Sequence, residues 1–176
     1  MHVLHEVLQI DRKVKCIHIK NLVTQEITSQ SYDTLILAPG AEAIMPDLPG
    51  IHAKNICTVK TVPDSDAIKT FLTNQHAQHA LVMGRGFIGL ETAEALVGCG
   101  LTVSVAEKAP QILPPFDHDM GSLVAHHLQE KGLKLIVGDG IKGFHWQDDM
   151  ACEAELESGK RLPMDLAILS IGYGLN

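Results

Sequence analysis

The chain has 176 residues, of which 45% are hydrophobic and 4% aromatic, and its 14 basic and 21 acidic side chains leave a net charge of −7. A chain of this length can bury one core, or one complete domain and part of another. The acidic balance and the scarcity of aromatic side chains argue against a nucleic-acid partner. No apolar run could span a bilayer and residues 1–6 do not resemble the start of a signal peptide, so we expect a cytoplasmic protein without a membrane partner.

The first 50 residues predict a β-meander followed by a buried strand. Apolar residues flank the polar residues 11–13, and Ile27 interrupts a later polar stretch, which together indicate three short strands. Residues 34–38 form a continuous apolar run, the pattern of a strand buried on both faces of a parallel sheet. Prolines and glycines then predict a connecting segment over residues 41–63, before a helix capped by Asp64 or Ser65 that runs to Leu72.

The most specific motif lies at residues 80–107. An apolar strand leads into Gly84-x-Gly86-x-x-Gly89, a helix follows, and a second strand ends at the acid Glu107. This is the order of a dinucleotide-binding βαβ unit. Gly84 permits the tight turn, Gly86 admits a pyrophosphate close to the backbone, and Gly89 allows helix and strand to pack closely. The alternative is a βα turn that binds nothing, which the position of Glu107, roughly 20 residues further on, disfavours.

Charged residues beside this motif bear on the choice of nucleotide. A carboxylate at Glu107 can accept hydrogen bonds from both adenosine ribose hydroxyls and would repel a 2′-phosphate, which predicts NADH rather than NADPH. Lys108 either accommodates such a phosphate or is a solvated surface charge. Arg85, between the first two glycines, either assists phosphate binding or points to solvent.

The remaining residues predict alternating helix and strand. Prolines at 110, 114 and 115 favour a loop, and Asp117 or Asp119 caps a helix that ends at Gly132, with His127 as a partly buried residue on its apolar stripe. A strand over 133–137, short β-structure over 141–162 and a buried strand over 165–172 complete the chain. Neither the ten histidines nor the four separate cysteines have the spacing of a metal site, so we expect no bound metal.

Two segments share one pattern. Residues 32–40 and 164–172 each combine an acid, an apolar strand and terminal small residues. With the glycine motif and Pro46-x-x-Pro-Gly50, they make the chain resemble the FAD-dependent pyridine nucleotide-disulfide oxidoreductases, especially the branch with coenzyme A-disulfide reductase, NADH oxidase and NADH peroxidase. The resemblance covers essentially the whole chain. It implies an α/β fold in which residues 51–176 form a Rossmann-like NAD(H)-binding domain with a parallel sheet and a β-meander. Residues 1–50 would be the end of a first FAD-binding segment and the crossover that follows it.

The resemblance implies cofactor contacts for this chain and no catalytic residue. Contacts to the pyrophosphate and adenosine would fall on Gly84, Gly86, Gly89, Glu107 and Phe116, with Lys108 beside Glu107. Contacts near the nicotinamide would fall on Phe87, Ile88, Gly172 and on Glu91 in the first helical turn, with Phe87 as a gate over the flavin. In an intact protein Ala38, Pro39 and Gly40 would approach FAD.

The resemblance also implies what the parent protein does. It would transfer hydride from NADH to FAD and then to a disulfide, a peroxide or oxygen, as a homodimer formed through a region missing here. Because this chain has no redox cysteine and no first FAD glycine loop, we expect it to be the middle of a longer enzyme and inactive alone. The alternative is a standalone nucleotide-binding module without turnover, and bound flavin would discriminate between an active enzyme and such a module.

Overall fold

The structure is a computed structural model that describes residues 1–175. The chain divides into one unit over Met1–Pro39 and a second that begins at Gly40. This division precedes the boundary expected at residue 50, because the crossover already packs on the second unit. The Ile44 N–H donates to Gly172 O at 3.0 Å, and Leu48 packs against a buried cluster of that unit. No helix in the described residues is long and apolar enough to cross a membrane.

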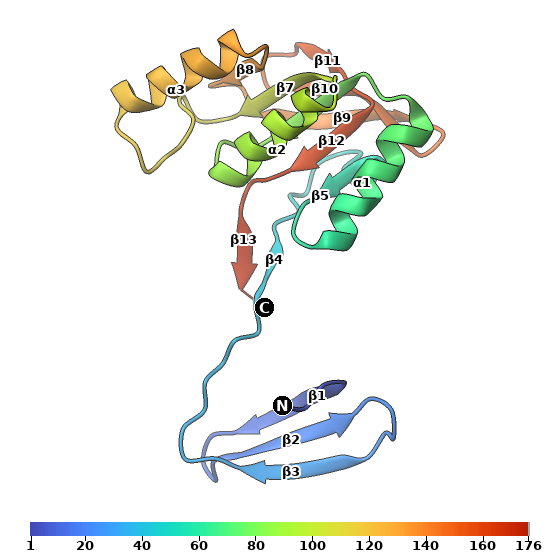
Figure 1. The fold of residues 1–176 in the computed structure, drawn as a ribbon, viewed down its shortest axis with the longest axis vertical. Helices are drawn as coiled ribbons and strands as arrows, with labels where there is room; N and C mark the ends of the chain where they lie inside the picture. The colour runs from blue at the N-terminus through green and yellow to red at the C-terminus, as the bar shows by residue number, and fades with distance from the viewer. Residues whose placement is uncertain (176) are drawn as a thin grey trace. The chain divides into compact units, whose positions relative to one another are not determined.

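The first unit is the expected β-meander (Figure 1). Strands β1 (His5–Asp11), β2 (Cys16–Asn21) and β3 (Ile27–Ser31) pair antiparallel in that order. Each turn is held by the side chain that ends the preceding strand. Asp11 accepts hydrogen bonds from two backbone N–H groups in the first turn, and Asn21 does so in the second. Such bonds explain why these polar residues stop the strands here.

The buried strand expected over residues 34–38 is absent, and that prediction is wrong for this chain. The segment has no strand assignment, and the side chains of Ile36 and Leu37 are 87% and 67% exposed. A strand of a parallel sheet needs neighbours that share its backbone hydrogen bonds. No strand among residues 1–175 pairs with this run, so its backbone is not part of a sheet despite its apolar side chains.

A five-stranded parallel sheet forms the centre of the second unit. Its order is β5-β12-β6-β7-β8, and every neighbouring pair is parallel. The strands are β5 (Ile56–Thr58), β6 (His79–Met83), β7 (Thr102–Glu107), β8 (Lys134–Val137) and β12 (Leu166–Leu169). Strand β5 lies in the segment expected to be a connection, because three residues are too few to show a period. Its pairing with β12 makes it an edge of the sheet.

Three helices cover one face of this sheet (Figure 1). They are α1 (Val62–Gln75), α2 (Phe87–Gly98) and α3 (His118–Glu130). The N-cap of α1 is Thr61, not Asp64 or Ser65: the Thr61 hydroxyl accepts from the Asp64 N–H, and the Asp64 carboxylate accepts from the Thr61 N–H. This reciprocal capping box satisfies two N–H groups at the start of the helix.

Helix α3 begins after Asp117, as expected, but only part of its apolar stripe is buried. Val124, Ala125 and Leu128 pack against the core, whereas Met120 and Leu123 are exposed. His127 is exposed as well, so its expected place on a partly buried stripe is wrong. The helix therefore packs on the core along a narrower face than its apolar residues alone indicate.

An antiparallel meander covers the other face. It comprises β9 (Ile141–Gln147), β10 (Met150–Leu156) and β11 (Arg161–Pro163), which confirms the short β-structure expected over 141–162. The central sheet packs against both layers, as strand β6 shows. Ala80 and Val82 belong to the hydrophobic cluster on the helix side of the sheet, and Leu81 belongs to the cluster on the meander side. Side chains that alternate in this way place apolar residues on both faces of one strand.

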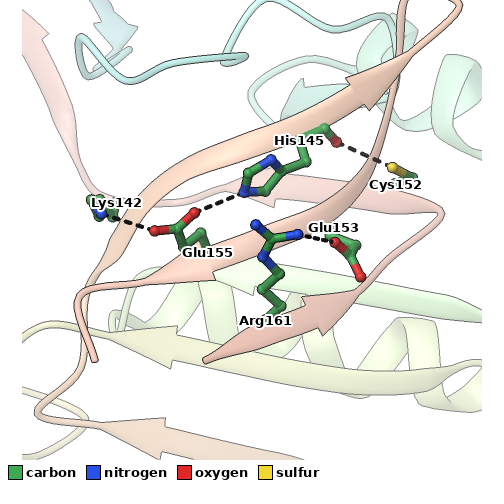
Figure 2. Close-up of polar contacts among 6 residues, drawn as sticks. All are labelled: Lys142, His145, Cys152, Glu153, Glu155 and Arg161. Atoms are coloured by element: carbon green, nitrogen blue, oxygen red, sulfur yellow. Dashed lines mark hydrogen bonds and ion pairs between the residues drawn. The ribbon is translucent and has the colours of Figure 1, made fainter. Parts of the chain in front are cut away.

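A polar network crosses the outer surface of the meander (Figure 2). The Glu155 carboxylate accepts hydrogen bonds from Lys142 Nζ and His145 Nε2, each at 2.8 Å, and Arg161 pairs with Glu153 at 3.3 Å. Cys152 Sγ donates to the backbone oxygen of His145, not to its ring. Within residues 1–175 no three His, Cys, Asp or Glu side chains gather in a group that could hold a metal ion.

Replacing Glu155 with glutamine is expected to destabilise the protein at neutral pH, by an amount that shrinks in acid. Hydrogen bonds from Lys142 and then His145 lower the pKa of Glu155 from 4.5 to about 2. A depressed pKa in the folded state stabilises the fold above the unfolded pKa, and this contribution disappears as the pH falls through the folded pKa. Urea unfolding of wild type and Glu155→Gln should therefore differ by a constant amount above about pH 4.5 and converge toward about pH 2.

Glu94→Gln is the matched control for this experiment. Glu94 is an exposed residue of α2 that takes part in no ion pair of the described chain, so its replacement should change stability little at any pH. A Glu155→Gln difference that stays constant down to about pH 2 would contradict the assigned interaction.

The first and last strands of the second unit pair with each other (Figure 1). Strand β4 (Ala41–Ala43) pairs antiparallel with β13 (Tyr173–Leu175), with Tyr173 opposite Ala43. The Tyr173 hydroxyl also donates to the backbone oxygen of Val59 at 2.5 Å. The segment from β5 to β12 therefore begins and ends next to this pair of strands.

Candidate functional site

The turn between β6 and α2 requires glycine at its first motif position. Gly84 has φ +122°, and a Cβ built on it would lie 2.1 Å from the backbone oxygen of Ser170. Ser170 directly follows β12 and donates its N–H to Met83 O at 2.7 Å, which holds the two strand ends together. Only a residue without a side chain fits here.

The second and third glycines have different surroundings. Gly86 is the N-cap of α2, no side chain caps the helix, and a Cβ on Gly86 would meet nothing within 4 Å. The N–H groups of the first turn therefore have no partner within the helix, and the positive end of its dipole is open to an anion. Gly89 lies against Gly84, where a Cβ would come within 3.1 Å of the Gly84 oxygen. Its small size permits the close approach of helix and turn.

A pocket of about 540 Å³ opens at this turn. Four predicted contact residues from the turn and the first turn of α2 line it, as do Glu107 at the end of β7 and Gly172 before β13. The complete lining is Gly84, Arg85, Gly86, Phe87, Ile88, Glu107, Pro114, Ser170, Ile171, Gly172 and Tyr173.

Other predicted contact residues lie outside the pocket lining. Gly89 sits beneath the turn, and Lys108 and Phe116 lie beyond the lining. Glu91 is the fifth residue of α2, not part of its first turn, and it lines a separate groove of about 430 Å³ between α1 and α2.

The three residues expected to approach FAD lie at the division between the two units. Ala38 and Pro39 belong to the first unit and Gly40 begins the second, and all three are exposed.

Glu107 presents one side of its carboxylate to the pocket. The side chain is 15% exposed, its Oε1 accepts a hydrogen bond from the Ala109 N–H at 2.8 Å, and Arg85 Nε lies 3.9 Å from the same oxygen. Within the described chain no hydrogen bond engages Oε2. Glu107 thus has one oxygen fixed by the protein and one available to a ligand.

Arg85 does not point into solvent, the second of the two alternatives considered for it. Its Nη1 donates to the backbone oxygen of Gln111 at 3.2 Å, its Nε faces Glu107, and the side chain is only 30% exposed. It lies between the glycine turn and the loop after β7, where it lines the pocket. Its backbone oxygen also accepts from the Leu113 N–H at 2.9 Å, which ties the same two segments together.

Lys108 is paired away from the pocket. Its Nζ donates to Glu157 Oε1 at 2.7 Å, and this bond raises the pKa of Lys108 above its ordinary value. The side chain is 76% exposed. This geometry favours a surface ion pair over a group that holds a nucleotide phosphate.

Two aromatic side chains expected at opposite ends of the nucleotide contact each other. The rings of Phe87 and Phe116 meet edge to face with centroids 6.0 Å apart. They are 51% and 40% exposed, and only Phe87 lines the pocket. The contact is possible because the loop after β7 returns to the start of α2, where the Gln111 side chain donates to Phe116 O.

Four lining residues were not predicted as contacts from the sequence: Pro114, Ser170, Ile171 and Tyr173. Ser170 and Ile171 follow β12, the parallel neighbour of β6. The carboxyl ends of parallel strands meet at one edge of a sheet, which is where ligands of such folds bind. Recognising residues 165–169 as a neighbour of the glycine-motif strand would have identified them.

The comparisons with known proteins agree with this geometry. The family model for pyridine nucleotide-disulphide oxidoreductases matches residues 1–176. A coenzyme A disulfide reductase of Staphylococcus epidermidis is 33% identical over 168 residues, which cover 96% of this chain and 36% of that protein. The chain thus spans about a third of the length of this curated relative.

Solved structures show the same relationship. The reduced Bacillus anthracis CoADR-RHD superimposes with a TM-score of 0.86 and 38% identity, over 97% of this chain and 30% of the other. The water-forming NADH oxidase of Lactobacillus brevis bound to NADH superimposes with a TM-score of 0.83 and 27% identity, over 96% of this chain and 37% of the other. With a family model that matches from end to end and relatives that share its fold, this chain belongs to the pyridine nucleotide-disulphide oxidoreductase family.

Proposed function

We propose that this chain is the NAD(H)-binding portion of a flavin-dependent NADH oxidoreductase that delivers hydride from NADH to FAD. The observation that carries the proposal is the pocket with Gly86 and the open N-terminus of α2 on one side and Glu107 on the other. When bound there, NADH supplies the hydride, and the protein supplies position and selectivity.

Each part of the pocket suits a different part of the nucleotide. The open N–H groups at the start of α2 suit a pyrophosphate, because they combine hydrogen-bond donors with the positive end of the helix dipole. Glu107 Oε2 suits the adenosine ribose hydroxyls. Phe87, Ile88 and Gly172 line the remainder and are the proposed neighbours of the nicotinamide.

The pairing of β4 with β13 supports a role within a longer protein. A unit whose two ends lie side by side can be inserted into another domain without separating that domain's parts. We propose that residues 51–176 are the NAD(H) domain and that residues 1–50 belong to an FAD domain and its crossover. Ala38, Pro39 and Gly40 would then approach the flavin. Because of the relatives named above, we propose a disulfide or oxygen as the electron acceptor, with a peroxide as the third candidate. We also propose that the intact enzyme is a homodimer.

The second candidate is a standalone nucleotide-binding module without turnover. All the described residues that line the pocket belong to the second unit, which supports nucleotide binding by that unit. For this chain alone we propose binding of NADH without bound flavin and without catalysis. Stoichiometric flavin absorbance in the purified chain would overturn that expectation.

Calorimetric titration is expected to show NADH binding at least about 10-fold more tightly than NADPH, since about 1.4 kcal/mol of repulsion at Glu107 suffices for that ratio. Equal affinities would contradict the role of Glu107. Lys108→Gln separates the two readings of that lysine. If Lys108 is a surface ion pair with Glu157, the ratio stays unchanged; if Lys108 holds a 2′-phosphate, NADPH binding weakens further and the ratio rises.

A further inference from the structure

We infer that Arg85 is a second, latent determinant of nucleotide choice: it is neutralised by Glu107 in the wild type and becomes the partner of a 2′-phosphate when the Glu107 carboxylate is removed. This inference rests on the proposed function, because it concerns the adenosine end of the same pocket. It differs from the selection by Glu107 in that it assigns a role to the residue between the first two glycines.

The pocket contains one cation and one anion. Of the side chains that line it, Arg85 alone is basic and Glu107 alone is acidic. Their charged groups lie 3.9 Å apart, and both side chains are largely covered, at 30% and 15% exposure. Solvent screens partly covered charges less than surface charges, so each of these groups dominates the potential that a ligand meets when the other is absent.

The surrounding contacts hold the Arg85 guanidinium at this place. Nη1 donates to Gln111 O at 3.2 Å, and the Arg85 backbone oxygen accepts from Leu113. The anchor does not depend on Glu107, so the cation stays beside the pocket after a substitution there. No hydrogen bond within residues 1–175 engages Nη2, which leaves donors for a phosphate oxygen. Arginine is the side chain best suited to that contact.

Lys108 does not offer an equivalent cation. It adjoins Glu107 in sequence, but its ammonium is paired with Glu157 at 2.7 Å and lies outside the pocket lining. To bind Lys108, a phosphate has to break the ion pair between Lys108 and Glu157. To bind Arg85 in the Glu107→Gln variant, it has only to take the place of the Glu107 carboxylate.

The wild type therefore selects NADH through a carboxylate that also cancels a nearby cation. Glu107→Gln keeps the size of the side chain, removes its charge and replaces one acceptor oxygen with an amide NH2 group. NADH should bind this variant about 10-fold less tightly, since a charge-assisted hydrogen bond becomes a neutral one. NADPH should bind about 10-fold more tightly, because repulsion is replaced by attraction to Arg85. The preference is thus expected to invert and not merely to disappear.

A cycle of four proteins tests the inference: wild type, Glu107→Gln, Arg85→Gln and the double variant, each titrated with NADH and with NADPH. The double variant lacks both charges, so its two affinities should agree within about threefold. Arg85→Gln alone leaves an uncompensated carboxylate and should bind NADPH still more weakly than the wild type does. In Glu107→Gln the NADPH affinity should fall steeply with added salt, as expected for an ionic contact.

Several outcomes would overturn the inference. Glu107→Gln could fail to gain NADPH affinity, or the double variant could keep the inverted preference of Glu107→Gln. The gain in NADPH affinity could instead be lost in Glu107→Gln/Lys108→Gln and kept in Glu107→Gln/Arg85→Gln. That result would show that Lys108, not Arg85, contacts the phosphate. Circular dichroism and urea midpoints are compared across the set, so that a folding defect is recognised as such. Wild-type protein that binds neither nucleotide would refute the proposed function itself, a result distinct from all of these.

Discussion

Gly84→Ala is expected to destabilise the protein by about 2–6 kcal/mol and to abolish NADH binding, because it combines backbone strain at positive φ with overpacking. The new Cβ would lie 2.1 Å from the oxygen and 2.6 Å from the carbonyl carbon of Ser170. Both are backbone atoms and cannot rotate away. Relief requires β6 and β12 to separate where Ser170 bonds to Met83, and this also deforms the pocket. The measurement is urea unfolding combined with calorimetric titration of NADH.

Gly86→Ala is the matched control, two residues away in the same turn. Gly86 has φ −81° and ψ 175°, an extended conformation that alanine adopts, and its Cβ would meet nothing within 4 Å. Stability should therefore fall by no more than about 1 kcal/mol, the cost of a poor N-cap residue. NADH affinity should fall at least about 10-fold, because the methyl group occupies the path of a pyrophosphate against the backbone.

The two variants thus separate folding from binding. A Gly84→Ala protein with the wild-type urea midpoint would contradict the close contact with Ser170. A Gly86→Ala protein with full NADH affinity would show that the pyrophosphate does not pass over this glycine.

Asn55→Leu is expected to cost about 3–9 kcal/mol, because it leaves three backbone groups without partners at about 1–3 kcal/mol each. Asn55 is 1% exposed. Its Nδ2 donates to Ala151 O at 2.7 Å and to Asp165 O at 2.8 Å, and its Oδ1 accepts from the Ala151 N–H at 2.7 Å. One side chain thus joins the segment before β5 to the meander and to the start of β12. Loss of this much free energy is a large fraction of the stability of an ordinary domain.

Asn74→Leu is the matched substitution. Asn74 is an exposed residue near the end of α1, and the same change there should alter the free energy of unfolding by no more than about 0.5 kcal/mol. Both variants are compared by urea unfolding. Equal costs at the two sites would mean that Asn55 does not hold the three segments together.

The sequence predicts the βαβ unit well because its signals are local. Gly84, Gly86 and Gly89 are required by the backbone conformation and close contacts of a single turn. The apolar runs of β6 and β7 are long enough to be recognised as strands. The cap of α1 is also a local signal. Thr61 and Asp64 have the spacing of a capping box, so the cap is Thr61 and not the predicted Asp64 or Ser65.

The prediction fails where a segment depends on a partner. Residues 34–38 have the composition of a buried strand and yet are exposed, since apolar character does not supply a neighbouring strand. Residues 56–58 are too short to show a pattern and yet form an edge of the sheet, because β12 supplies their hydrogen bonds.

The glycine turn, the acid at the end of the second strand and the family could all be recognised from residue types at fixed spacings. The groups that the charged residues meet became known from the folded chain. It pairs Lys108 with Glu157, 49 positions away, and places Arg85 between Gln111 and Glu107 instead of in solvent. Such contacts join segments that chain folding brings together, and their distances follow from the packing of whole elements.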